Sequence, residues 1–438
     1  MNEYKSFIFD SYSFDEATGT LELRYALDNE ISFTETLILP REGMFRIGVD
    51  DELLDRAFFA LHIIGGISYY KTCCPKNIEV LSGNLSSTQS LFWNTVYRKG
   101  LAEFFYTNNI DSDELINFPV EASEDPEPIS WEADHERVLV PVGGGKDSIV
   151  TIEMLKEAKM DILLMRMGKH PLIEEVAKVA KLPILYIERR LDPRLFELND
   201  DGALNGHVPI TAYVSFLSVI TSLLYGCDYI AFSNERSASE GNIEGEDINH
   251  QWSKSMEFER MIHHYIHSFL TPDLDYFSLL RTMSELLISS NFAQLPQYFQ
   301  CATSCNANWK ISEQSDKRWC RKCPKCAFVY CQFAAFLPKD KLMEIFGTNM
   351  LADEDLLPLY RQLLGLEGTK PFECVGTPHE VAAAFLLIKE RGEHTDTCAM
   401  EMFTSQHLES IADPKALIVD TIAIAEEHNV SDKFLKQL

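Results

Sequence analysis

The sequence predicts an α/β protein built on a doubly wound parallel sheet, and three observations support this fold class. After residue 138, short apolar segments alternate with segments of helical spacing, which is typical of β-α-β units. Residues 1–40 show the alternation of strands instead, and the residues after 335 have the spacing of helices. A chain of 438 residues, with 46% hydrophobic and 24% charged residues, has room for roughly two or three globular domains.

An N-terminal α+β domain is predicted at residues 1–125. Three apolar runs separated by turn residues predict a small antiparallel meander, at residues 7–9, 21–25 and 31–37. Residues 51–70 and 85–106 carry apolar side chains at helical spacing. The segment 121–132 is acidic and contains prolines, so we interpret it as a linker.

A nucleotide-binding domain is predicted at residues 133–335. Its predicted strands lie at 138–142, 162–165, 184–187 and 229–232, and its predicted helices at 148–159, 172–180 and 211–225. The strands are short and mostly apolar, as expected for a parallel sheet buried on both faces. Residues 250–300 are expected to be mainly helical. A helical region at residues 336–438 is expected to contribute to the active site.

The loop after the first of these strands, in VPVGGGKDS, has the features of a phosphate-binding site. Glycines let a ligand approach the backbone, and the loop leads into a predicted helix, whose free N–H groups and positive dipole end face the same point. Lys146 adds a cation there. The spacing is neither that of a Walker loop nor that of a dinucleotide fold. The predicted phosphate-binding residues are Gly143, Gly144, Gly145, Lys146, Asp147 and Ser148. The alternative is an ordinary turn between a strand and a helix.

Four cysteines form a second pattern, in which two overlapping C-x2-C units follow one upstream cysteine. These residues are Cys305, Cys320, Cys323 and Cys326. Four thiolates suit tetrahedral zinc and would leave it no open position, so we predict a structural Zn²⁺ site in a knuckle at residues 305–326. The alternatives are an iron–sulfur cluster and free buried thiols. Three histidines, His263, His264 and His267, are interpreted as a polar cluster because no third metal ligand is evident.

Charge and composition exclude several partners. The net charge of −28 argues against a broad nucleic-acid surface, although a local basic pocket is compatible with it. The N-terminus has no signal-peptide pattern, and the longest apolar run, at 212–226, is shorter than a membrane span. Eleven cysteines, an odd number, fit a reduced cytoplasm with a metal site better than a disulfide framework. We therefore expect a cytoplasmic protein with no membrane partner, and the oligomeric state stays open.

These motifs resemble those of known families. GGGKDS is similar to the pyrophosphatase loop (PP-loop) of ATP pyrophosphatases, usually SGGxDS, with Gly143 in place of the serine. The loop and the knuckle, together with NGHVPITAYVSFLSVITSLLYGCDYIAFSNE, resemble 7-cyano-7-deazaguanine synthase. The whole chain resembles the MurL family, the UDP-N-acetylmuramoyl-L-alanyl-L-glutamate epimerases of peptidoglycan synthesis. That resemblance rests on SYSFDEATGTLELRYALD, VPVGGGKDS, SNERSASEGN, the cysteines and KPFECVGT.

The resemblance implies an enzyme that adenylates the terminal L-glutamate of a UDP-muramoyl dipeptide and inverts its Cα. ATP phosphates would lie on the glycine loop, and Lys146 with Mg²⁺ would stabilise the departing pyrophosphate. Asp147 would orient the loop or the metal. Asn234 and Glu235 would border the same cleft.

The residues that move the Cα proton are not fixed by the resemblance. Our candidates are His207, Glu373, Cys374 and Cys398, because such groups can have pKa values near the working pH. The alternatives are that His207 caps the helix after Pro209 and that Cys374 is simply buried. Two other classes of function remain: another PP-loop ligase, making an amide, a nitrile or a thiolated base, and a nucleotide sensor without activity. The intact Lys146 and Asp147 argue against the sensor.

Overall fold

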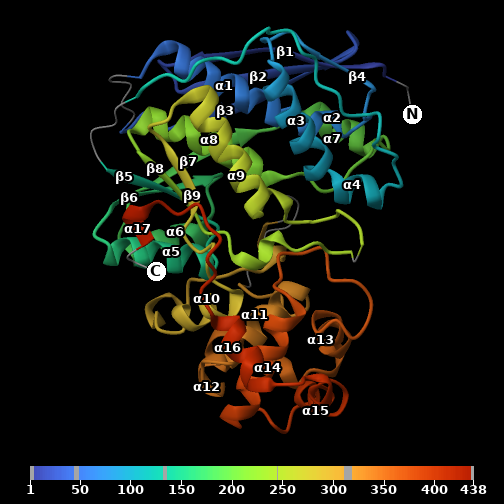
Figure 1. Ribbon diagram of the computed structural model, residues 1–438, viewed down its shortest axis with the longest axis vertical. Coiled ribbons are helices and arrows are strands. Elements are labelled where there is room, and N and C mark those ends of the chain that lie inside the picture. The colour runs from blue at the N-terminus through green and yellow to red at the C-terminus, as the bar shows by residue number, and fades with distance from the viewer. Residues whose placement is uncertain (1–3, 44–48, 132–135, 244, 310–317, 436–438) are drawn as a thin grey trace.

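The chain folds around one mixed sheet in the order β4-β1-β2-β3-β7-β6-β5-β8-β9, as the computed structural model shows (Figure 1). The structure describes residues 4–43, 49–131, 136–243, 245–309 and 318–435. The strands are β1 (Ser6–Asp15), β2 (Thr20–Leu27), β3 (Ile31–Ile38), β4 (Asn77–Val80), β5 (Arg137–Pro141), β6 (Asp161–Met167), β7 (Ile184–Arg190), β8 (Tyr229–Phe232) and β9 (Asp275–Ser278).

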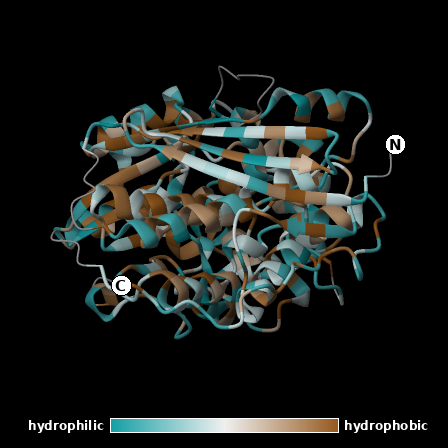
Figure 2. Ribbon diagram, turned by 90° about the horizontal axis from the view of Figure 1, so that it is seen from above, coloured by the Kyte–Doolittle hydropathy of each residue, from teal (hydrophilic) through white to brown (hydrophobic). Residues whose placement is uncertain are grey.

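The predicted N-terminal meander is confirmed. β1 pairs with β2, and β2 with β3, both in antiparallel register. Every second side chain of β2 is buried, because successive side chains of a strand point to opposite faces. Figure 2 shows the matching alternation of hydrophobic and hydrophilic residues along these strands. β4, which pairs parallel to β1, was not predicted, because only Ile78 and Val80 are buried in this short strand.

The predicted parallel strands are also confirmed, each with bounds close to those expected. β5 lies between β6 and β8, β7 lies beyond β6, and all these pairs are parallel. A correction concerns residues 250–300, where β9 extends the sheet beside β8. It is only Asp275–Ser278, with three consecutive buried residues, so it shows no alternation that would reveal a strand.

Helices cover both faces of the parallel strands. Val138 and Val140 face one apolar core, whereas Leu139 between them faces the other, which fits a sheet buried on both sides. The helices that precede the cysteines are α1 (Asp51–Gly65), α2 (Ile67–Tyr70), α3 (Ser87–Gly100), α4 (Ala102–Thr107), α5 (Lys146–Glu157), α6 (Pro171–Ala180), α7 (Pro193–Asp200), α8 (Ile210–Tyr225), α9 (Met256–Tyr265) and α10 (Glu285–Phe292).

The C-terminal region is helical, as predicted, and forms the lower body in Figure 1. Its helices are α11 (Pro324–Ala334), α12 (Lys339–Phe346), α13 (Leu357–Leu363), α14 (Pro378–Arg391), α15 (Cys398–Gln406), α16 (Pro414–Ile422) and α17 (Asp432–Leu435). α17 returns to the sheet, where Phe434 packs edge-on against Tyr229 of β8, with ring centroids 5.1 Å apart. Within the described ranges, no helix has both the length and the apolar character needed to cross a membrane.

The sheet is mixed rather than wholly parallel because β3 pairs antiparallel with β7 and joins the meander to the parallel strands. A buried ion pair supports this junction. The guanidinium of Arg189 donates to both carboxylate oxygens of Glu35, at 2.8 and 3.0 Å, and the hydroxyl of Tyr213 donates to the same carboxylate at 2.6 Å. Glu35 is fully buried. The division of the chain near residues 125 and 335 stays a prediction.

We expect Glu35→Gln to destabilise the fold, because it leaves the guanidinium of Arg189 in the interior without a counter-charge. Breaking a buried pair in this way costs about 3–5 kcal/mol. Urea unfolding of wild type and variant measures the change. The control is Glu188→Gln in a solvent-exposed pair with Arg190, for which a loss of about 0.2–1 kcal/mol is expected. Equal unfolding midpoints for the two variants would contradict the role of the junction.

Candidate functional site

The glycine loop joins β5 to α5 at the carboxyl end of the parallel strands. Gly144 has φ +82°, a conformation that favours glycine. A Cβ on Gly145 would lie 2.5 Å from Oγ of Ser304, so that hydroxyl would have to turn away, whereas Gly143 has open space around it. No acceptor among the described residues pairs with the backbone N–H groups of residues 143–148. The loop therefore has free donors at a helix N-terminus, as an anion site requires.

Lys146 is buried between two carboxylates. Its ammonium donates to Asp147 and to Glu285, which begins α10, and the exposed fractions of Lys146 and Glu285 are 1% and 0%. Burial alone would lower the pKa of Lys146, but the two carboxylates outweigh it and raise this pKa. Burial raises the pKa of Glu285 to about 7, against the pull of Lys146. Sequence reasoning missed Glu285 because it lies far along the chain and outside any motif.

Asn234 and Glu235, both predicted, follow β8 and are buried at the same end of the sheet. The amide of Asn234 donates to Oγ of Ser278 at 3.0 Å, which links the ends of β8 and β9. The buried Arg281 donates to the carbonyl oxygens of Glu235 and Lys254, at 2.7 and 2.6 Å. Its charge is balanced by the carboxylate of Glu259 at 2.7 Å, so this ion pair fixes two backbone segments that border the site.

The four predicted cysteines come together and form what we call the cysteine knuckle: Cys305, Cys320, Cys323 and Cys326. Their sulfur atoms all lie within 4.8 Å of one another, and the Sγ atoms of Cys320 and Cys326 are 3.7 Å apart. Zinc–sulfur bonds of 2.3 Å in a tetrahedron place sulfur atoms about 3.8 Å apart, so the set has the size of a metal centre. Hydrogen bonds among these thiols lower the pKa of Cys305 and raise the pKa of Cys326.

The segment 373–374 lies against the knuckle through α11, whose N-cap is Cys323. The backbone N–H of Lys325 donates to Oε2 of Glu373 at 3.0 Å, and its ammonium donates to the carbonyl oxygen of Cys374. The same ammonium lies 3.8 Å from Glu285. Lys325 thus connects the carboxylate beside the glycine loop to the predicted Cys374.

Cys374 belongs to a group of side chains that we call the thiol cluster: Glu103, His207, His250, Lys254 and Cys374. The ammonium of Lys254 donates to Sγ of Cys374 at 3.2 Å. Nδ1 of His250 is hydrogen-bonded to Glu103, and His250 and Cys374 interact electrostatically. Nδ1 of His207 lies 3.8 Å from Glu103, and the rings of His207 and His250 are 4.4 Å apart. The structure therefore brings the predicted Cys374 and His207 together through residues that the sequence analysis missed.

The charges of the thiol cluster shift its pKa values in opposite directions. Burial alone would raise the pKa of Cys374, but the cations of Lys254, His250 and Lys325 lower it to about 6. Burial alone would lower the pKa of His250, but its bonds to Cys374 and Glu103 raise it to about 9. Burial lowers the pKa of His207 to about 4, and His250 adds to this effect.

The remaining candidates lie elsewhere or have other partners. α8 begins at Pro209 without a side-chain cap, so the capping alternative for His207 is wrong. Cys398 begins α15, where its thiol donates to the carbonyl of Leu351 at 3.4 Å. His263 and His267 lie next to the backbone carbonyl oxygens of residues 276 and 274, at 3.3 and 3.2 Å. The third metal ligand that was not evident in the sequence is present as Asp275, because the ligand atoms of His263, His267 and Asp275 lie within 4.8 Å of one another. The interpretation as a polar cluster stays a prediction.

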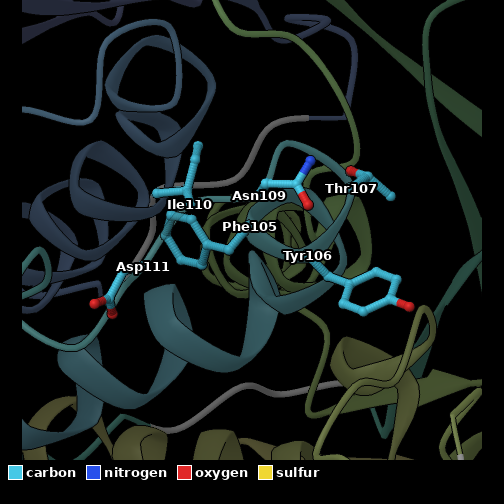
Figure 3. Close-up of a pocket in the computed structure, with 6 residues that line it drawn as sticks. All are labelled: Phe105, Tyr106, Thr107, Asn109, Ile110 and Asp111. Atoms are coloured by element: carbon cyan, nitrogen blue, oxygen red, sulfur yellow. The ribbon is translucent and has the colours of Figure 1, made fainter.

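A surface pocket of about 600 Å³ lies at the C-terminal end of α4 (Figure 3). It is lined by Phe105, Tyr106, Thr107, Asn109, Ile110 and Asp111. None of these residues belongs to the thiol cluster, although Glu103 lies on the same helix and the ring of Tyr106 is 6.3 Å from that of Phe372. The pocket is thus a neighbour of the thiol cluster and shares no residue with it.

The fold and the site define a class of α/β protein in which a glycine loop, buried lysines and a thiol meet at the carboxyl ends of parallel strands. The chain belongs to the MurL family: the MurL N-terminal domain matches residues 1–279 and the MurL C-terminal domain matches residues 301–417. This confirms the family resemblance of the sequence. The similarity to PP-loop enzymes stays a prediction.

Three relatives carry the name UDP-N-acetyl-alpha-D-muramoyl-L-alanyl-L-glutamate epimerase. The protein of Salinispora tropica is 43% identical over 398 residues, covering 89% of this chain and 86% of that protein. That of a Micromonospora species is 41% identical over 398 residues, covering 89% and 88%. That of Xanthomonas oryzae pv. oryzae is 38% identical over 434 residues, covering 98% and 96%.

Proposed function

We propose that this chain is an ATP-dependent epimerase of peptidoglycan synthesis that acts in the cytoplasm. In this proposal it adenylates the terminal L-glutamate carboxylate of UDP-MurNAc-L-Ala-L-Glu, inverts its Cα, and releases UDP-MurNAc-L-Ala-D-Glu, AMP and pyrophosphate. The observation that carries the proposal is the similarity, over 98% of the chain, to a protein named as the epimerase of this substrate.

Adenylation of the substrate carboxylate would make the Cα proton easier to remove. A proton next to a free carboxylate is hard to remove, because the product would be a dianion. When the carboxylate oxygen displaces pyrophosphate from ATP, the acyl-adenylate loses that negative charge and its carbonyl accepts electrons from the C–H bond. A proton then returns to the opposite face of Cα, and water cleaves the anhydride to give the carboxylate and AMP.

A concentration of cations supports an anionic substrate at this site. The chain has a net charge of −28, yet the buried Lys146 and Lys325 and the half-buried Lys254 lie along one path of contacts from the glycine loop to Cys374. The ammonium of Lys370 is buried with no hydrogen-bond partner among the described residues, and it interacts with Glu235 and Glu285. Such lysines suit phosphates and the two carboxylates of a glutamyl residue.

The carboxylates beside Lys146 fit a magnesium ion, which prefers carboxylate and phosphate oxygens. Oε1 of Glu285 is buried without a hydrogen-bond partner among the described residues, and Asp147 lies beside the same ammonium. Mg²⁺ would supply positive charge to the triphosphate and the departing pyrophosphate. Asp147 and Glu285 would hold it, and the free N–H groups of residues 143–148 would bind phosphate oxygens.

The reaction itself is tested with UDP-MurNAc-L-Ala-L-Glu, ATP and Mg²⁺ in deuterated water. We expect AMP and the D-glutamyl product, with deuterium at Cα, because the departing proton exchanges with solvent. Chiral amino-acid analysis and mass spectrometry measure both. Release of AMP with formation of an amide, a nitrile or a thiolated base would favour a PP-loop ligase instead, and product without deuterium would exclude solvent exchange.

We expect Lys146→Ala to abolish AMP formation, with a loss of at least about 100-fold, because the cation beside the departing pyrophosphate is removed. Pyrophosphate release measures the rate. The matched control is Lys156→Ala on the same helix, where the lysine pairs with Glu153 near the surface. Circular dichroism checks that both variants fold. A folded Lys146→Ala protein with the wild-type rate would contradict the assignment of the ATP site.

We expect the cysteine knuckle to hold about one zinc per chain in a structural role, since four thiolates fill the coordination of the ion. Metal analysis by mass spectrometry should find this zinc, and Cys323→Ser should lose it and unfold at a lower temperature. Cys73→Ser, which changes a half-buried thiol outside the knuckle, should keep both properties. A zinc-free protein that is folded and active would contradict this role.

A further inference from the structure

Charged groups from three separate segments converge on the thiol of Cys374. Lys254, in the short helix η2 (Trp252–Lys254), donates to Sγ at 3.2 Å. The charge of His250, in the preceding loop, acts on the same sulfur and lowers the pKa of Cys374. Lys325 of α11 holds the Cys374 carbonyl from the other side. A thiol placed among three cationic side chains is held as a thiolate.

We propose that Cys374 is the group that removes the Cα proton, and that His250 and Lys254 are the positioning residues that keep its sulfur ionised. This assignment rests on the proposed function. The thiolate takes the proton as an S–H bond, and the C–H electron pair moves onto the acyl-adenylate carbonyl. A second proton, of solvent origin, then returns to the opposite face of Cα.

The contrast with the other thiols supports this choice. Burial raises the pKa of each cysteine outside the knuckle except Cys374, namely Cys73, Cys74, Cys227, Cys301, Cys331 and Cys398. Those cysteines are therefore neutral packing side chains. Cys374 differs because cations surround it.

The neighbouring candidates are less suited to the same step. Glu373 accepts the N–H of Lys325 at the start of α11, so its carboxylate already holds the segment against the knuckle. The partner of His207 is Glu103, and His207 does not contact Lys325. Lys325 is the residue that links Cys374 to the proposed site of adenylation. Glu373 and Cys374 are both joined to the glycine loop through Lys325, Glu285 and Lys146, but Cys374 uses only its backbone carbonyl for this contact, so its thiol is not occupied by it.

Glu103 orients the ring of His250 within the thiol cluster. Its carboxylate is bonded to Nδ1 of His250, and the charge of the His250 ring lowers the pKa of Cys374. Charges thus alternate along Lys254, Cys374, His250 and Glu103. This is the geometry of a reactive thiol, a histidine and a group that orients the histidine. Loss of Glu103 would act on Cys374 only through His250.

The pH dependence follows from the sign of these charges. A base works only when ionised, so exchange at Cα rises with pH through the pKa of Cys374, which is about 6. Removal of a neighbouring cation favours the neutral thiol and raises that pKa. His250→Gln and Lys254→Met should each move the rise to higher pH by at least about one unit.

The first experiment needs no substrate. The rate of alkylation of Cys374 by iodoacetamide, followed by peptide mass spectrometry against pH, should have its midpoint near 6 in the wild-type chain. The midpoint should move upward in His250→Gln and Lys254→Met, while Cys73 in the same digest keeps its own profile. Unchanged midpoints at Cys374 would overturn the proposal, because a merely structural role of His250 and Lys254 would not shift them.

The second experiment separates proton transfer from adenylation in deuterated water. Cys374→Ser should form AMP within a few-fold of wild type but lose deuterium incorporation at Cα by at least about 100-fold. His250→Gln should regain incorporation as the pH is raised. Cys73→Ser should behave as wild type.

The outcomes are distinguishable. Wild-type exchange in Cys374→Ser overturns the assignment of the base, and so does loss of AMP formation in that variant, because Cys374 would then act in adenylation. Failure of the wild-type chain to form AMP overturns the proposed function and this assignment together, whatever the alkylation profile. If Cys374→Ser does not fold, Cys374→Ala takes its place in the same assay.

Discussion

The buried pairing of Lys146 with Glu285 is the constraint on which the rest of the site depends. An ammonium that is 1% exposed is tolerated only beside a counter-charge, because an unpaired ion in the interior costs several kcal/mol. The glycine loop and the first turn of α10 must therefore stay in contact. Lys325 approaches the same carboxylate at 3.8 Å and bonds to the backbone at Cys374, so α11 and the segment that follows residue 370 are fixed as well.

The same constraint shows how an acidic protein could hold the proposed site for anions. The carboxylates that neutralise the lysines lie beside them inside the protein. The lysines are therefore held in place, and they do not make the outer surface of the protein more positive. Burial raises the pKa of Glu285 to about 7, which leaves this carboxyl sensitive to any cation or phosphate that enters. A bound phosphate and its metal would change the balance of charge where Lys146 and Glu285 meet, and would couple nucleotide binding to α10.

Sequence reasoning predicted what is local in the chain. The glycine loop, the four cysteines and the parallel strands each depend on residues within a short window, and the structure has all of them. Sequence reasoning did not identify Glu103, His250 or Lys254, because none of them belongs to a motif in its own segment. Each is placed in the cluster only when the fold brings it close to Cys374. The strands β4 and β9 were missed because four residues are too few to show a period.

The thiol cluster is assembled from both halves of the family's sequence. Glu103, His207, His250 and Lys254 lie within residues 1–279, whereas Lys325 and Cys374 lie within residues 301–417. In the proposed assignment, His250 and Lys254 from the first half and Lys325 from the second keep the sulfur of Cys374 ionised, and the backbone of Cys374 is placed by α11 from the second half. The cysteine knuckle begins α11 and therefore fixes Lys325 in position. A structural metal at the knuckle would thus act on the site through one helix, by setting where Lys325 meets Glu285 and Cys374.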